Sequence, residues 1–156
     1  MIYQFSMGNV IMKEEMMSER IIKEDKCSQR YYVCSRVKHA PYWIALREKG
    51  ISIVSSWIDE AGDNETEDFG ELWKRIESEI YSDCNALLMM VYPEDFPLKG
   101  ALVEVGIALA YNKKIYIYAP NVILEGRTFR PLGSWIKHPN VTFIDNIENF
   151  LQLEQQ

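Results

Sequence analysis

The chain has 156 residues, of which 47% are hydrophobic and 26% are charged, and its formal net charge is −6. This length fits one ordinary domain, and the hydrophobic fraction is high enough to build a core. The acidic balance argues against broad binding to a nucleic-acid backbone, because proteins that bind nucleic acids usually present a basic face. A small anionic ligand remains compatible with this charge, since a few local donors are enough to bind it.

The sequence also disfavours membrane proteins and zinc proteins. No stretch approaches the roughly 18 consecutive apolar residues that a membrane-spanning helix needs, and the N-terminus lacks the pattern of a signal peptide. The protein is therefore expected to be cytoplasmic, without a membrane partner. The three cysteines and two histidines form no recognisable zinc pattern, so neither a metal nor a cofactor is expected.

The first part of the chain predicts an extension, a strand, a helix and a second strand. Residues 1–29 are rich in methionine and then charged, without a sustained apolar period, and we expect a poorly ordered N-terminal extension there. The segment YYVCS (31–35) has the composition of a strand, and PYWIALREKG (41–50) begins with proline and ends with glycine, as helices often do. ISIVSS (51–56) predicts the second strand, and the acidic segment 57–68 predicts a loop.

The middle of the chain contains the most strongly patterned elements. Residues 69–81 predict a helix. The segment NALLMMVY (85–92) is a continuous apolar run, which is typical of a strand buried on both faces. A loop at 93–99 leads to a predicted helix at 100–111, and KKIYIYAP (113–120) predicts the fourth strand.

The last part of the chain predicts a fifth strand at VTFI (141–144) and a terminal helix at 145–156. Strands that alternate with helices along a chain imply a parallel sheet with helices on both faces. We therefore predict one α/β domain over residues 30–156, with a Rossmann-like three-layer α/β/α fold and a parallel five-stranded sheet.

Glu104 is the most unusual residue of the predicted helix at 100–111. It is the only charged residue between Lys99 and Lys113, in a helix that is otherwise apolar and therefore expected to be buried. A buried carboxylate needs either a partner or a task. Because Glu104 lies within about one turn of the helix N-terminus, whose free N–H groups favour negative charge, we expect it to be ionised.

The residues around Glu104 resemble a known family. The segment SDCNALLMMVYPEDFPLKGALVEVGIALAYNKKIYIY (82–118) is similar to the core of the nucleoside 2-deoxyribosyltransferase-like family, whose motif reads G-x-x-x-E-x-G-x-A; with YYVCSR, the similarity spans about residues 30–120. The resemblance implies that Glu104 attacks the anomeric carbon of a nucleoside or nucleotide, expels the base and leaves a glycosyl-enzyme ester that water or another base resolves. It also implies assembly through helices, so a homo-oligomer is expected.

The chain departs from the family pattern at the residues that handle the base. Relatives usually carry an aspartate about eight residues before the position of Asp83, where it protonates or holds the base, and this chain has Arg75 there. Many relatives also have an aspartate just before the motif, a role that Asp95 could fill only with a different loop path. Glu77 or Glu79 can substitute as the acid if the helix register differs, and Glu79 is predicted beside Glu104 as a catalytic residue; a solvated helix face is the alternative.

The other candidate residues follow the strands, because ligands in doubly wound sheets bind outside the carboxyl ends of the strands. By the resemblance, the first loop lies where relatives bind sugar or 5′-phosphate, and a guanidinium suits phosphate well. The face of Trp57 can stack on a base or belong to the core, and Asp59 can contact the ligand or only solvent. Lys99 can meet a phosphate at the helix entry, where Gly100 permits an unusual backbone angle. The candidate substrate-binding residues are Ser35, Arg36, Trp57, Asp59, Lys99 and Gly100.

These residues together predict N-glycosidic bond cleavage or transfer on a nucleoside or nucleotide, with a Glu nucleophile. The alternative is a non-catalytic module that binds a nucleotide or a nucleotide-derived signal in the same pocket. The replacement of the expected acid by Arg75 favours that alternative.

Overall fold

A computed structural model describes residues 29–62 and 65–155, so the predicted N-terminal extension lies outside the described residues except for its last residue. Five strands are present: β1 (Arg30–Cys34), β2 (Ser52–Ile53), β3 (Ala86–Met90), β4 (Lys114–Tyr118) and β5 (Val141–Phe143). The α-helices are α2 (Ala40–Glu48), α3 (Trp57–Glu60), α4 (Phe69–Ser78), α5 (Gly100–Ala110) and α6 (Ile147–Glu154). Short helical turns are η1 (Val37–His39), the π-helical η2 (Glu79–Asp83), η3 (Pro93–Asp95) and η4 (Ser134–Lys137).

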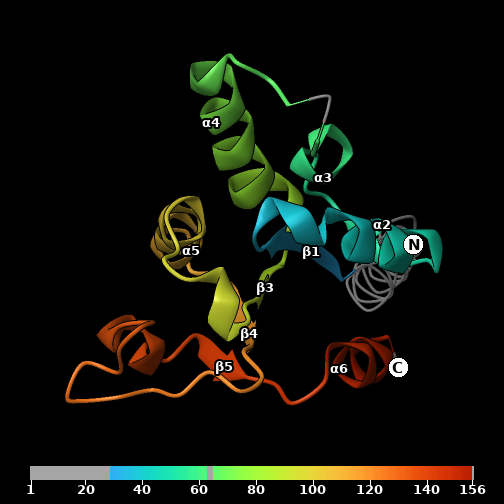
Figure 1. The fold of residues 1–156 in the computed structure, drawn as a ribbon. Helices are drawn as coiled ribbons and strands as arrows, with labels where there is room; N and C mark the ends of the chain where they lie inside the picture. Colours follow the sequence, from blue (N-terminus) through green and yellow to red (C-terminus); the bar gives the residue numbers. More distant parts are fainter. Residues whose placement is uncertain (1–28, 63–64, 156) are drawn as a thin grey trace, which may run out of the picture.

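The five strands form one parallel sheet in the order β2-β1-β3-β4-β5. Helices α4 and α5 lie on one face of this sheet, and α2 and α6 lie on the other (Figure 1). The predicted three-layer α/β/α fold with a parallel five-stranded sheet is therefore confirmed.

The alternation of side chains along β1 divides the core between the two faces of the sheet. Tyr32 and Cys34 pack with α4 and α5, whereas Tyr31 and Val33 pack with α2 and α6. All five residues of β3 are buried, because this strand is covered on both sides. Burial on both faces explains why residues 85–92 form a continuous apolar run in the sequence.

The second strand and the helix predicted at 69–81 differ in extent from the elements observed. The second strand covers only two residues, because the Ser55 hydroxyl accepts the Val33 N–H at 2.6 Å and so takes the place of a backbone partner. The chain then turns into α3, a short helix inside the segment predicted as a loop. The predicted helix at 69–81 ends as an α-helix at Ser78 and continues as a π-helical turn.

The order of the strands fixes where a ligand site can form. From β1 the chain passes to β2 on one side, whereas β3 is followed by β4 on the other side. The crevice outside the carboxyl ends of β1 and β3 is therefore the topological switch point of the sheet, where ligands bind in folds of this kind. Within the described ranges, no helix has both the length and the apolar character needed to cross a bilayer.

Candidate functional site

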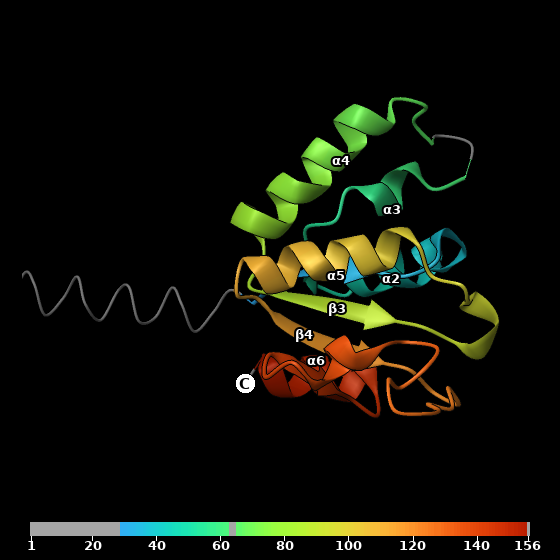
Figure 2. The ribbon, with the colours of Figure 1, turned by 90° about the vertical axis from the view of Figure 1, so that its left-hand side faces the viewer.

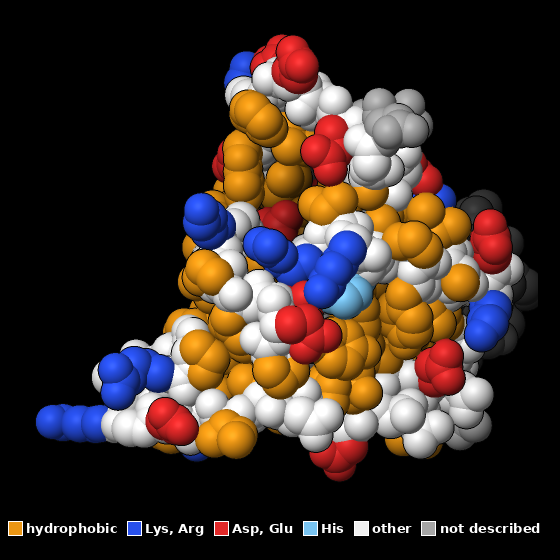
Figure 3. All heavy atoms as spheres, in the orientation of Figure 1, with side chains coloured by type: hydrophobic (Ala, Val, Ile, Leu, Met, Phe, Trp, Pro, Cys, Tyr) orange, Lys and Arg blue, Asp and Glu red, His pale blue; other side chains and the backbone are white. Residues whose placement is uncertain are grey.

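A cavity of about 500 Å³ lies at the switch point, between the β1–α2 turn, α3, α4 and the N-terminus of α5. Lys and Arg side chains gather on the face of the molecule that holds this opening (Figure 3). Of the residues predicted from the sequence, Ser35, Arg36, Trp57, Lys99, Gly100 and Glu104 line the cavity. The other lining residues are Val37, Lys38, Leu72, Trp73, Ile76, Leu98 and Ala101.

Glu104 lies on the face of α5 that packs toward the sheet, and only 8% of its surface is exposed. The Tyr32 hydroxyl, from β1, donates a hydrogen bond of 2.7 Å to Oε1 of Glu104. Burial raises the pKa of Tyr32 well above its ordinary value, so this hydroxyl stays protonated and remains a donor. The strand thus fixes the carboxyl group in one orientation at the cavity wall.

The buried environment of Glu104 makes it less ionised than the sequence predicts. Burial raises the pKa of Glu104 to about 7; hydrogen bonds from Tyr32 and Cys34 lower it in part, and the charge of Glu79 raises it further. Removal of the carboxylate from water outweighs the helix N-terminus, whose effect is modest and falls off within the first turn. Near neutral pH the group is therefore close to half ionised, which is the range in which carboxyl groups serve acid, base and nucleophilic chemistry.

Aromatic rings form the apolar part of the cavity wall. The indole N–H of Trp57 donates to the Val33 carbonyl oxygen at 2.9 Å, which fixes the ring against the end of β1. Trp73 of α4 also lines the cavity, close to the start of α5. Gly100 begins α5 with a negative φ, so it supplies no unusual backbone angle, and a Cβ added there would lie 3.6 Å from the Trp73 ring. Two indole rings thus supply the wall with flat apolar surface.

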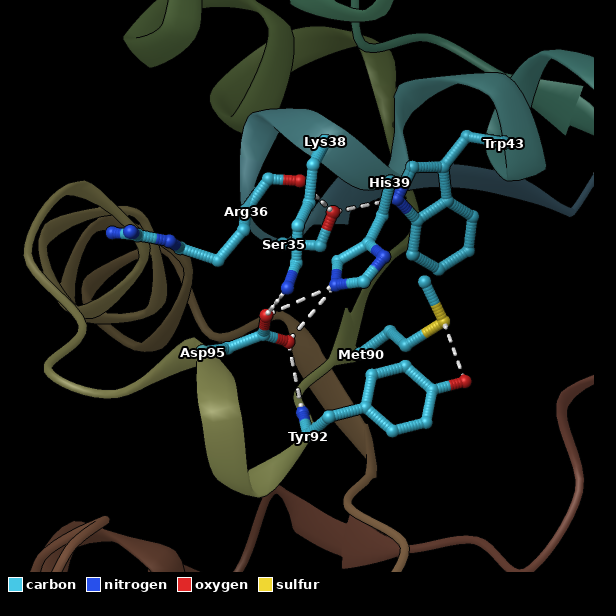
Figure 4. Close-up of polar contacts among 8 residues, drawn as sticks. All are labelled: Ser35, Arg36, Lys38, His39, Trp43, Met90, Tyr92 and Asp95. Atoms are coloured by element: carbon cyan, nitrogen blue, oxygen red, sulfur yellow. Dashed lines mark hydrogen bonds and ion pairs between the residues drawn. The ribbon is translucent and has the colours of Figure 1, made fainter.

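Ser35 and Arg36 both line the cavity, but they differ in whether their polar groups are already bonded within the protein. The Ser35 hydroxyl donates to the Arg36 carbonyl oxygen at 3.0 Å and accepts the indole N–H of Trp43 at 2.8 Å (Figure 4). This hydroxyl is therefore already bonded within the protein and braces the turn. The Arg36 guanidinium extends from the same turn toward α5 (Figure 4), where it is available to a ligand.

Asp59 does not join the cavity. It belongs to α3 and forms a fork with Arg47 of α2, with one N–O distance of 2.9 Å, and this pairing lowers the pKa of Asp59. Its carboxylate faces α2, and the cavity wall does not include it, so the role of Asp59 in substrate binding stays a prediction that this geometry does not support.

Glu79 does not line the cavity either, although only 6% of its surface is exposed. Its carboxylate accepts the Ser56 N–H at 3.2 Å and also the Ser56 hydroxyl, so it holds the turn between β2 and α3. Arg75 pairs with Glu60 of α3 and is not aimed at the cavity. In this geometry the Glu79 carboxylate serves Ser56, and its role as a catalytic residue stays a prediction.

Replacement of Glu79 separates these two roles. Glu79→Ala is expected to lower the free energy of unfolding by about 1–3 kcal/mol, because the Ser56 donors lose their buried acceptor. Glu79→Gln keeps an acceptor and should stay close to the parent protein in stability; its effect on any activity should be limited to a lower pKa of Glu104, because the nearby negative charge is gone. The measurement is urea unfolding, with Glu77→Ala, an exposed position near the end of α4, as the control. A loss of activity in Glu79→Gln without a loss of stability would contradict the structural role.

Sequence reasoning missed two residues of the site, Tyr32 and Lys38, and considered the third, Asp95, only for the role of the aspartate before the motif. Tyr32 shares its face of β1 with Cys34, and a polar atom on that face is the signal that could have found it. Asp95 turns back toward the β1–α2 turn and pairs with Lys38, a contact between segments far apart in the chain. Within the described part of the chain, no group of three or more His, Cys, Asp or Glu side chains is placed to hold a metal ion.

Comparison with known proteins adds no family to this geometry, since no family model and no curated protein matches the chain. The resemblance to the nucleoside 2-deoxyribosyltransferase-like family therefore stays a prediction.

Proposed function

We propose that this protein cleaves or exchanges the N-glycosidic bond of a nucleoside or nucleotide, with the Glu104 carboxylate as nucleophile. The observation that carries the proposal is the buried carboxylate of Glu104, held by Tyr32 at the wall of a cavity at the switch point of the sheet. The hydrogen bond from Tyr32 offsets only part of the cost of burying this carboxylate, which supports a functional role for Glu104.

The reaction proceeds in two displacements. An oxygen of ionised Glu104 forms a bond to the anomeric carbon while the bond from that carbon to the base nitrogen breaks. The electron pair leaves with the base, which takes a proton from water, and the sugar remains as an ester on Glu104. Water then attacks the anomeric carbon, gives its proton to solvent and restores the carboxylate; the nitrogen of a second base can take the place of water, which gives transfer.

The shape and lining of the cavity support a nucleoside-sized ligand. Its volume of about 500 Å³ falls in the usual range of small-molecule sites. The rings of Trp57 and Trp73 offer apolar faces to a base, and cationic side chains at the opening suit an anionic group on the sugar.

A second candidate function is a non-catalytic module that binds a nucleotide. The observation that favours it is that, among the described lining residues, Glu104 is the only carboxylic acid, because Glu79 and Arg75 are engaged elsewhere. Such a module would be stabilised by its ligand without consuming it.

A panel experiment distinguishes the two functions. The protein at high concentration is incubated with nucleosides, 5′-nucleotides and NAD, and free base is measured by chromatography. The enzyme requires release from at least one compound. Ligands that raise the melting temperature while no compound releases base would establish the binding module instead. Light scattering on the same sample tests the expected homo-oligomer.

The pH dependence of base release should follow the titration of Glu104. Only the ionised carboxylate can attack, and its pKa is raised to about 7, so kcat/KM should rise about tenfold per pH unit below 7 and level off above it. The measurement is the initial rate of base release between pH 5.5 and 8.5 at constant ionic strength. A rate that falls as pH rises through 7 would contradict a nucleophilic role.

A further inference from the structure

Asp95 is the most deeply buried carboxylate at the carboxyl end of the sheet, with 1% of its surface exposed. It follows β3 in η3, and its side chain accepts the Tyr92 N–H at 2.9 Å. It also pairs with Lys38 Nζ at 3.1 Å and with His39 Nε2 at 2.9 Å (Figure 4). Burial works to raise the pKa of Asp95, but the Tyr92 N–H, His39 and Lys38 together hold it below its ordinary value.

These contacts join two turns that are distant in the sequence. Lys38 and His39 belong to η1, directly after β1, whereas Asp95 belongs to the loop after β3. Lys38 lines the cavity, and 54% of its side chain is exposed. A lysine at such a position is ordinarily free to adopt many rotamers, so a buried ionic partner restricts where its ammonium group points.

The cavity opening has a surplus of positive charge in a protein that is acidic as a whole. Arg36, Lys38 and Lys99 all line it, and among the described residues neither Arg36 nor Lys99 forms an ion pair. Asp95 balances one of the three charges, which leaves about two before Glu104 is counted. The adjoining N-terminus of α5 has no side-chain cap, so its N–H groups also favour an anion.

We propose that Asp95 is a positioning residue that holds Lys38 over the cavity opening, where Lys38, Arg36 and Lys99 together bind a phosphate group on the substrate. A phosphate monoester carries a charge between about −1.5 and −2 at pH 7, which matches the surplus at the opening. The inference rests on the proposed function for the place of the sugar beside Glu104. It adds that the protein selects a phosphorylated substrate over the corresponding nucleoside.

Equilibrium binding tests the inference without turnover. Calorimetric titration of the four ribonucleoside 5′-monophosphates and their nucleosides is carried out in the Glu104→Gln background. Lys38→Met should weaken binding of the nucleotides about tenfold or more and leave the nucleosides unchanged, because a charge-assisted contact to phosphate is lost. Lys74→Met is the matched control, since Lys74 is exposed on α4 and pairs with Glu71 away from the cavity.

Asp95→Asn tests the positioning role. It should weaken nucleotide binding about three- to tenfold while nucleoside binding stays unchanged, and the double variant with Lys38→Met should bind no worse than Lys38→Met alone. Equal losses for nucleotides and nucleosides, or effects that add in the double variant, would overturn the proposal. If Asp95→Asn does not fold, Lys38→Arg decides the question: it can still pair with Asp95 and should keep the selectivity that Lys38→Met removes.

The binding measurements test the phosphate site separately from the proposed enzyme activity. Phosphate selectivity that depends on Lys38, with no base released from any compound, would keep this inference and remove the proposed enzyme. Base release that is equally efficient from nucleosides and nucleotides would keep the enzyme and remove the phosphate site.

Discussion

Replacement of Glu104 by glutamine is expected to lower base release by about 10³-fold or more, because an amide cannot form the glycosyl ester. Glutamine keeps the size of the side chain and an oxygen that can accept the Tyr32 hydrogen bond, so the cavity should keep its shape. The measurement is single-turnover base release with the best compound of the panel. Nucleotide binding should survive, and a variant that retains most of its activity would exclude a nucleophilic Glu104.

The same variant should be more stable than the parent protein in alkaline solution. The pKa of Glu104 is raised from 4.5 to about 7 in the folded protein, so folding holds its proton more tightly than the unfolded chain does. Ionisation of Glu104 therefore lowers the free energy of unfolding of the parent protein. This loss is absent below about pH 4.5, grows as pH rises to 7 and reaches up to about 3 kcal/mol above pH 7. Urea unfolding of both proteins at pH 5 and pH 8 measures the difference, with exposed Glu77→Gln as the control.

Tyr32→Phe is expected to produce the second large effect on the site. Its hydroxyl stabilises the ionised form of Glu104, so its loss should raise the pKa of Glu104 above about 7 and move the pH–rate profile to higher pH. Base release at pH 6 should fall about 10- to 100-fold, as expected for a lost hydrogen bond to a charged group, and should recover in part at pH 9.

The neighbouring residue supplies a matched control for this prediction. Tyr31 points to the opposite face of the sheet, and its buried hydroxyl has no hydrogen-bond partner within the described residues. Tyr31→Phe should therefore leave base release unchanged and leave stability equal or slightly higher. Equal losses of activity in Tyr31→Phe and Tyr32→Phe would mean that the effect arises from packing and not from the bond to Glu104.

The fold could be predicted because its strongest elements are encoded locally. The apolar run at 85–92 and the apolar helix at 100–111 correspond to β3 and α5, whose burial explains their composition. The shortness of β2 and the presence of the helix α3 were not predicted, because they depend on side chains from elsewhere. Ser55 replaces a backbone partner of β1, and the distant Glu79 carboxylate holds Ser56 at the start of α3.

The site could be predicted only in part, for a related reason. Glu104 stands out in the sequence because its neighbours are apolar, and the loops after the strands lead to Arg36, Trp57 and Lys99. The sequence predicted an ionised Glu104 and did not reveal that burial raises its pKa to about 7, which leaves it partly protonated near neutral pH. Whether a carboxylate faces a ligand or a cation of another element depends on tertiary contacts, and the pairing of Asp59 with Arg47 is not visible in the spacing of the residues.

Capture of the covalent intermediate tests the central claim most directly. The probe is a nucleoside 5′-phosphate with fluorine at the 2′ position of the sugar, because the electron-withdrawing fluorine slows the breakdown of a glycosyl ester. The protein is incubated with this probe, quenched in acid, digested and analysed by mass spectrometry. The account predicts an adduct of the sugar phosphate without its base on the peptide that contains Glu104, and no adduct in Glu104→Gln. Base release without an adduct on Glu104, or with an adduct on another residue, would contradict it.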